Sequence, residues 1–182
     1  MTGRRMRCCV AAILFIALGG LHPVIVLAAT LETEIKATFL YKFAAFVEWP
    51  DQVLGPPAAR FTICVAGTDP FQGALAEAIA GETVMGHLTA LHHLVRATPN
   101  AGCEIMFIDS SPGQSVGAAL AAVRGATVLT VTDQENGPHG IINFVLRDDH
   151  VRFEIDRAAA AQNHLAISSK LLNVAVPDGP AE

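Results

Sequence analysis

The sequence predicts an α/β domain with a central, mostly parallel sheet, helices on both of its faces, and a C-terminal antiparallel hairpin followed by a long helix. Two observations carry this prediction. Short strands that are apolar on both faces alternate with helical segments, which is typical of a parallel sheet buried between helices. A later segment instead alternates apolar and polar residues, as an antiparallel strand with one face in water does.

The first elements follow from hydrophobic spacing and from the residues that end each run. A helix is expected over residues 31–50, because its aromatic and aliphatic residues recur at helical spacing and Pro50 ends the run. After a loop rich in proline and glycine, residues 61–67 form a short apolar strand. Asp69 is then expected to cap a helix that ends at Gly81.

The second half of the chain continues this alternation. The expected elements are a strand within residues 84–94, a strand over 103–109, a helix over 110–125, a strand over 126–133, a hairpin over 140–156 and a helix from 157 to about 176. Ser111 is expected to cap the helix over 110–125, and the hairpin is expected to turn at Asp148 and Asp149.

The first 29 residues have the layout of a secretory signal peptide. Three arginines precede an apolar run, and small residues stand before a cleavage point after Ala28. A single membrane anchor is the alternative, but the apolar run is shorter than the roughly 20 residues of a span and Pro23 interrupts its extension. We therefore expect export to the periplasm, with residues 30–182 forming one domain.

Composition and charge exclude several classes of protein. Apolar residues make up 52% of the chain and charged residues 16%, which excludes a disordered chain. Loss of the three arginines of the leader lowers the basic count from 12 to 9 against 17 acids, so the mature chain carries a charge of −8. Nucleic-acid binding needs clustered Lys or Arg at the phosphates, and no such partner is expected.

Export also changes the interpretation of the cysteines. Removal of the leader leaves two of the four, Cys64 and Cys103, in an oxidising compartment. One intramolecular disulfide is expected. The alternative is two buried free thiols, because both residues lie in apolar, strand-like runs.

Few residues suggest cofactor or metal chemistry. Glycine-rich phosphate loops and the nucleophile elbow of hydrolases are absent. His87, His92 and His93 come nearest to metal-ligand spacing, but adjacent strand residues point to opposite faces. We expect neither a metal site nor a cofactor.

No catalytic set is expected either. Ser168, Ser169 and Lys170 are one or two positions apart on the expected helix, so their side chains do not face each other. Glu154 is expected to be neutralised by Arg152 beside it on the same strand. The carboxylates therefore show no desolvated acid–base pair.

Aromatic crowding between positions 39 and 49 is the more informative feature. Three phenylalanines there share one helical face, and core packing is their expected role. Tyr41 lies on another face and Trp49 at the end of the helix, and both residue types are enriched at protein interfaces. The alternative is that these two residues only cover the edge of the sheet.

Seven segments occur together in an order typical of one family. They are KATFLYKFAAFVEWP, FTICVAGTDPF, CEIMFID, LTVTD, GIINF, VRFEID and AISSKLLNVA. The chain thereby resembles the YfiR-like family of periplasmic regulators of membrane diguanylate cyclases. The resemblance implies a dimeric α/β protein that restrains a cyclase through the periplasmic sensory domain of the enzyme, lowering cyclic-di-GMP, and that an outer-membrane-associated lipoprotein can sequester.

The resemblance also extends to individual residues. Cys64 and Cys103 match a cysteine pair of the family, whereas the stretch at 136–140 lacks the second pair that some members have. The glycine pair of the family appears here as His139–Gly140. Redox sensitivity that depends on the second cysteine pair is therefore not implied for this chain.

The leading hypothesis is a regulatory binding protein without catalysis. Its expected contact residues are Tyr41, Lys42, Glu48 and Trp49.

The alternative is a small-ligand sensor that acts on a histidine kinase or another membrane receptor. Open α/β sheets bind ligands at the carboxyl ends of their strands, and four polar residues fall there. They are Thr68, Asp69, Ser110 and Ser111. A third hypothesis is a hydrolase that uses Ser110 or Ser111, although no motif supplies a histidine and an acid to activate either serine.

Overall fold

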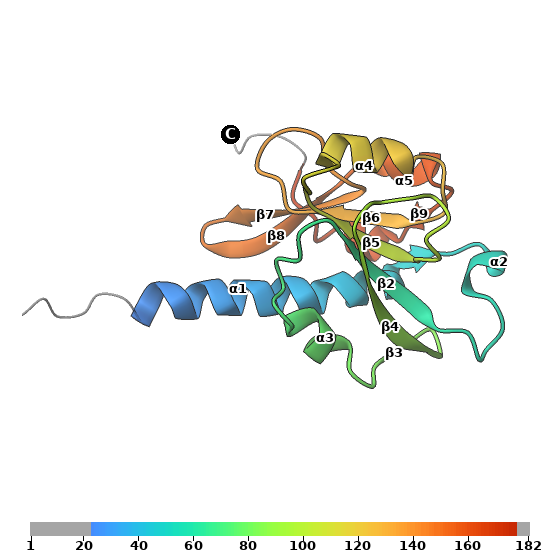
Figure 1. Cartoon of the computed structure of the whole chain (residues 1–182), viewed down its shortest axis with the longest axis horizontal. Helices are drawn as coiled ribbons and strands as arrows, with labels where there is room; N and C mark the ends of the chain where they lie inside the picture. Colours follow the sequence, from blue (N-terminus) through green and yellow to red (C-terminus); the bar gives the residue numbers. More distant parts are fainter. Residues whose placement is uncertain (1–22, 178–182) are drawn as a thin grey trace, which may run out of the picture.

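The structure, a computed structural model that describes residues 23–177, is a mixed α/β fold built on a curled seven-stranded sheet (Figure 1). The strands follow the order β3-β4-β2-β5-β6-β7-β8 across the sheet. Their bounds are β2 Phe61–Ala66, β3 Thr83–Val84, β4 His87–Leu94, β5 Ile105–Ile108, β6 Leu129–Thr132, β7 Ile142–Arg147 and β8 His150–Ile155. The five central strands pair in parallel, and the edge strands β3 and β8 pair antiparallel to their neighbours.

Helices lie on both faces of this sheet, with α1 and α3 on one side and α4 on the other (Figure 1). The helical elements are α1 Pro23–Lys42, the 3-10 turn η1 Phe43–Phe46, α2 Asp51–Leu54, α3 Ala74–Ile79, α4 Val116–Ala122, α5 Arg157–Gln162 and α6 Ser169–Leu172. A separate two-stranded sheet joins β1 (Val47–Glu48) to β9 (Ala166–Ile167). Residues 1–22, which hold most of the expected signal peptide, lie outside the described residues.

Alternation along the central strands divides the core into two layers. Along β2, Ile63 and Val65 pack in the cluster on the α1 face, while Cys64 and Ala66 pack with Val116 of α4. All six residues of β2 are buried. The prediction of a parallel sheet covered on both faces is therefore confirmed.

Aromatic rings attach the end of α1 to strands β7 and β8. The Phe43 ring centroid lies 5.0 Å from that of Phe153 in an edge-to-face arrangement and 5.8 Å from that of Phe144. Phe39 makes a second edge-to-face contact with Phe153 at 6.1 Å. Such pairs contribute about 0.5–1.5 kcal/mol each beyond the area they bury, so this cluster positions the helix firmly on the sheet.

The first helix ends earlier than predicted. Helical geometry stops at Phe46, and Val47 and Glu48 are extended, whereas the sequence predicts a helix up to Pro50. The backbone of these two residues pairs with Ile167 and Ala166 of β9. This pairing explains the change, because the β9 segment needs a hydrogen-bonding partner that a helix cannot provide.

The long C-terminal helix is a wrong prediction. α5 ends at Gln162. The side-chain amide of the next residue, Asn163, accepts from the Gly125 N–H and donates to the Val128 carbonyl, both at 2.9 Å, which holds this end of the helix in place. His164 then takes a left-handed conformation with φ of 59°. A separate short helix, α6, then begins after Ser168, whose hydroxyl caps it.

Two predicted helix caps are also wrong. α4 is capped by Ser115, whose hydroxyl accepts from the Ala118 N–H, while Ser111 lies in the preceding turn. Asp69 accepts from the Phe71 N–H at 2.8 Å and so stabilises a turn before α3, whose N-cap is Gly73. In both cases the chain makes a tight turn before the helix, so that the residue predicted as the cap comes too early in the sequence to cap it.

The disulfide between Cys64 and Cys103 is present. It joins β2 to Cys103, two positions before β5 begins, with the two Cα atoms 5.9 Å apart. The two residues are 39 positions apart, so the bond closes a sizeable loop around α3 and the β3–β4 pair.

Reduction of this disulfide is expected to lower the free energy of unfolding by about 4 kcal/mol, because the unfolded chain regains the entropy of the open loop. Urea unfolding with and without reducing agent measures the change. The double variant Cys64→Ala, Cys103→Ala is the control and should not respond to reducing agent. Equal unfolding midpoints for the oxidised and reduced wild-type protein would contradict this expectation.

Candidate functional site

The carboxyl ends of the parallel strands meet at one edge of the sheet and bring two of the predicted ligand residues together. The Thr68 hydroxyl, just after β2, donates to the Ser110 carbonyl at 2.8 Å, and Ser110 follows β5. Gly67 makes this approach possible, since a Cβ there would lie 2.2 Å from the Asp109 carbonyl oxygen. The loops that follow β2 and β5 therefore bond to each other.

The other two predicted ligand residues are also engaged within their loops. One Asp69 oxygen accepts from the Phe71 N–H, and the other lies 3.8 Å from His93 Nδ1. The Ser111 hydroxyl faces the Val95 carbonyl at 3.5 Å, and neither Ser110 nor Ser111 has a histidine bonded to its hydroxyl among the described residues. Ligand binding at these four positions stays a prediction, and the activated serine of a hydrolase is not seen here.

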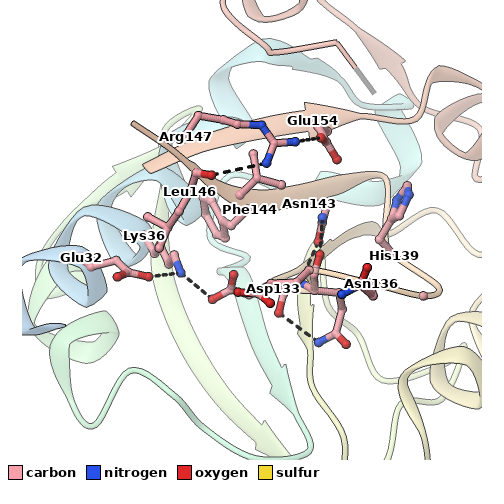
Figure 2. A pocket seen from close by; sticks show the side chains of 14 residues that line it. Glu32, Lys36, Asp133, Asn136, His139, Asn143, Phe144, Leu146, Arg147 and Glu154 are labelled. Atoms are coloured by element: carbon pink, nitrogen blue, oxygen red, sulfur yellow. Dashed lines mark hydrogen bonds and ion pairs between the residues drawn. The ribbon is translucent and has the colours of Figure 1, made fainter. Parts of the chain in front are cut away.

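A large polar cleft lies one strand further along, at the carboxyl end of β6 (Figure 2). Its volume is about 780 Å³, within the range of about 300–1,000 Å³ that small-molecule sites occupy. The lining comes from α1, from the loop that joins β6 to β7, and from β7 and β8. The principal side chains are Glu32, Lys36, Asp133, Asn136, His139, Asn143, Arg147 and Glu154.

Lys36 forms the α1 wall of the polar cleft. Lys36 is only 8% exposed, and its ammonium group donates to Asp133 at 2.6 Å and to Glu32 one helical turn earlier. Burial alone would lower the pKa of Lys36, but the hydrogen bonds to Asp133 and Glu32 outweigh it, so the pKa lies above its ordinary value. Lys36 is therefore charged throughout the physiological range and ties α1 to the end of β6.

Arg147 and Glu154 form the opposite wall. The guanidinium of Arg147 donates to Glu154 at 3.1 Å across the β7–β8 pair, and Glu154 is 7% exposed (Figure 2). The expectation that Arg152 neutralises Glu154 is therefore wrong. Arg147 pairs directly with His150 and Glu154 with Asn143, so the two residues lie four positions apart along the hairpin, and the long side chain of Arg147 spans that separation to reach the carboxylate.

The loop between β6 and β7 is held at both ends by hydrogen bonds. Asn143 accepts from the Gln134 N–H at 3.0 Å and donates to the Gln134 carbonyl at 2.9 Å. Thr132 donates to Asn143 and accepts from the Gly140 N–H, each at 2.9 Å. This fixed loop gives the polar cleft a preformed wall.

The arrangement suits a small polar molecule with groups of both signs. Each cation of the polar cleft has a carboxylate partner, so the site offers paired donors and acceptors without the excess positive field that a polyanion needs. In the described part of the chain, no three His, Cys, Asp or Glu side chains come together in a metal-binding arrangement.

Sequence reasoning missed this cleft, although one signal pointed to it. Asp133 follows β6 directly, and the rule that selected Thr68 and Ser110 after their strands selects it equally. Lys36 and Arg147 carry no comparable signal, because only the fold brings them to this edge.

The predicted partner residues divide between surface and core. Lys42 and Glu48 are exposed, Tyr41 is half-buried, and the Lys42 ammonium lies 6.0 Å from the Tyr41 ring centroid. Trp49 is only 9% exposed: its indole donates to the Ala44 carbonyl at 3.1 Å and its ring meets Phe61 edge-to-face at 5.6 Å. Trp49 thus belongs to the core.

Exposed apolar side chains continue this surface. Tyr41 and Lys42 line a shallow cavity of about 300 Å³ together with Val84 and Met85, at the β3–β4 hairpin. Met85 and the nearby Leu88 are both exposed. Among residues 23–177, no helix combines the length and apolarity needed to cross a bilayer.

Comparison with known proteins identifies a family. A family model described as YfiR/HmsC-like matches residues 33–176, which run from the middle of α1 past α6. No curated protein matches the chain.

Lys36→Gln is expected to lower the free energy of unfolding by about 1–3 kcal/mol at neutral pH, because two carboxylates lose a charged donor. The raised pKa fixes the pH dependence: the contribution is complete below the ordinary lysine pKa of 10.5 and is lost as pH rises through the higher folded-state value. Chemical unfolding at pH 7 and at strongly alkaline pH measures both.

The control is Lys42→Gln, which removes an exposed lysine that forms no ion pair within residues 23–177 and should change stability by about 0.5 kcal/mol or less. Equal losses from the two variants would contradict the role given to Lys36.

Proposed function

Because the chain belongs to the YfiR/HmsC-like family, we propose that it is an exported regulatory protein that restrains an inner-membrane diguanylate cyclase by binding the periplasmic domain of the enzyme. Members of this family are periplasmic regulators of diguanylate cyclase systems and not enzymes. The observation that carries the proposal is the family match over residues 33–176. The Cys64–Cys103 disulfide supports it, since such bonds persist in oxidising compartments.

The mechanism would be a shift of populations in the cyclase. A regulator that binds the inactive state of the sensory domain more tightly than the active state lowers the active fraction, by at most the ratio of the two affinities. No bond is made or broken. An outer-membrane-associated lipoprotein that binds the regulator would reverse the effect by lowering its free concentration.

The proposed contact surface, here called the Tyr41 surface, consists of Tyr41, Lys42 and Glu48 with Met85 and Leu88 beside them. Tyr41, Lys42 and Met85 line one shallow cavity, and an aromatic ring beside exposed apolar and charged side chains is typical of a protein interface. Homodimerisation, which the family resemblance implies, is part of this proposal.

Deletion of the gene is expected to raise cellular cyclic-di-GMP, and the wild-type gene should restore the lower level. An unchanged level, with no response from a neighbouring membrane cyclase or kinase, would contradict the proposed function.

The Tyr41 surface is tested separately, by titrating the purified protein with the periplasmic domain of the responding cyclase. Tyr41→Ala should weaken binding by about 30-fold or more, the loss typical of a central aromatic anchor. Glu48→Lys should alter the salt dependence of binding, while the matched control Glu77→Lys on α3 should not. Wild-type affinity of Tyr41→Ala together with an unchanged salt dependence of Glu48→Lys would show that the interface lies on another surface.

A second function, a small-ligand sensor for a histidine kinase or another membrane receptor, is favoured by the polar cleft. A ligand that binds only the folded protein raises the melting temperature in proportion to the logarithm of its concentration. A thermal-shift screen with amino acids and nucleotides at millimolar concentration is expected to give a hit that Arg147→Gln abolishes. A hit abolished instead by Thr68→Ala with Ser110→Ala would place the ligand after β2 and β5, and no hit would remove the sensor function.

A further inference from the structure

A second cavity, the basic-rimmed groove, opens between the end of α1, the edge strand β8 and α6. Its volume is about 470 Å³. Seven apolar side chains line it: Phe39, Phe43, Phe46, Val151, Phe153, Leu171 and Val174. The remaining lining residues are Lys42, Arg152 and Lys170.

The groove is apolar at its base and open at its mouth. Phe43 and Phe153 are buried and meet edge-to-face at 5.0 Å, which makes a rigid base. Phe39 and Phe46 are half-buried, and Val174 is 62% exposed at the mouth. Transfer of apolar surface out of water is favourable, so this groove favours an apolar occupant that covers it.

The charges around the groove differ from those of the polar cleft. Lys36 and Arg147 have carboxylate partners, whereas Lys42, Arg152 and Lys170 form no ion pair with any described residue. No aspartate or glutamate lines the groove. Three unpaired cations on a chain with 17 acids and 12 basic residues create a local positive field that an anionic group would complement.

The lining also disfavours a peptide occupant. A peptide brings backbone amides that need partners, and no hydroxyl or amide side chain lines the groove. Strand addition to β8 is also restricted, because the Phe153 carbonyl already accepts from the Val176 N–H at 2.9 Å. An alkyl chain needs no hydrogen bonds and suits this lining better.

We propose that the basic-rimmed groove binds a single-chain amphiphile with an anionic head, of the class of long-chain carboxylates. The alkyl chain lies on Phe43 and Phe153, and the head group lies among Lys42, Arg152 and Lys170. The site is separate from the polar cleft, and the proposal does not depend on regulation of a cyclase. Each methylene that enters the groove tightens binding by about fourfold, since burying a methylene contributes about 0.8 kcal/mol.

Calorimetric titration of the purified protein with octanoate, decanoate and dodecanoate, each below its micelle concentration, tests the proposal. Each step of two methylenes is expected to tighten binding by about 15-fold. Dodecyltrimethylammonium, with the same chain length and the opposite charge, should bind at least tenfold more weakly than dodecanoate. No binding, no dependence on chain length, or equal binding of the cationic amphiphile would overturn the proposal.

A matched pair of variants locates the binding site. Val174→Glu places a carboxylate at the mouth of the groove, and Val95→Glu makes the same change at a side chain that is 84% exposed after β4. Both positions are exposed, so melting temperatures should stay close to that of the wild type. Val174→Glu should weaken dodecanoate binding by at least tenfold and Val95→Glu should leave it unchanged. Equal effects would overturn the assignment, as would a dimer that covers the groove and prevents binding.

Discussion

The packing of Phe43, which directly follows α1, against strands β7 and β8 is the contact on which the rest of the structure depends. Its ring is 2% exposed and meets Phe39, Phe144 and Phe153. Truncating a buried phenylalanine typically costs about 3–5 kcal/mol, a large share of the stability of a domain this size. Because α1 is a continuous helix up to Lys42, fixing Phe43 also fixes Lys36 two turns earlier. The side chains that α1 contributes to the candidate surfaces therefore take their positions from this contact.

The three surfaces around α1 differ in how their charges are satisfied, and that difference sets their chemistry. In the polar cleft, Lys36 and Arg147 are held by carboxylates, so a ligand must compete with existing ion pairs and is selected by shape and hydrogen bonding. In the basic-rimmed groove, the cations have no such competition, so charge and apolar area select the occupant. The Tyr41 surface is shallow and exposes Met85 and Leu88, which suits a broad protein contact.

The sequence predicts the sheet well because its signal is local to each strand. The strands β2, β5 and β6 are short apolar runs bounded by turn residues, and their burial on both faces follows directly. The C-terminal helix fails because Ile167, Leu171 and Val174 keep helical spacing, while the break comes from Asn163, whose hydrogen-bond partners lie 35 and 38 positions away. The Arg147–Glu154 pair is missed for a related reason, since the contact depends on the path of the long Arg147 side chain across the folded hairpin. Local patterns thus predict elements, and distant contacts decide where they end and which side chains form a site.

The His139–Gly140 pair illustrates how a fixed backbone and a variable site coexist. A Cβ at position 140 would lie 2.8 Å from the Thr130 carbonyl oxygen, so the close passage of the loop beside β6 requires glycine there. Position 139 has no such restriction: His139 is half-buried and lines the polar cleft (Figure 2). The second glycine of the family pair is thus a packing requirement, while the first is a place where the side chain can change. A histidine at that place brings an imidazole ring with two nitrogen atoms to the wall of the cleft, so the chemistry of the cleft can vary without moving the loop that forms it.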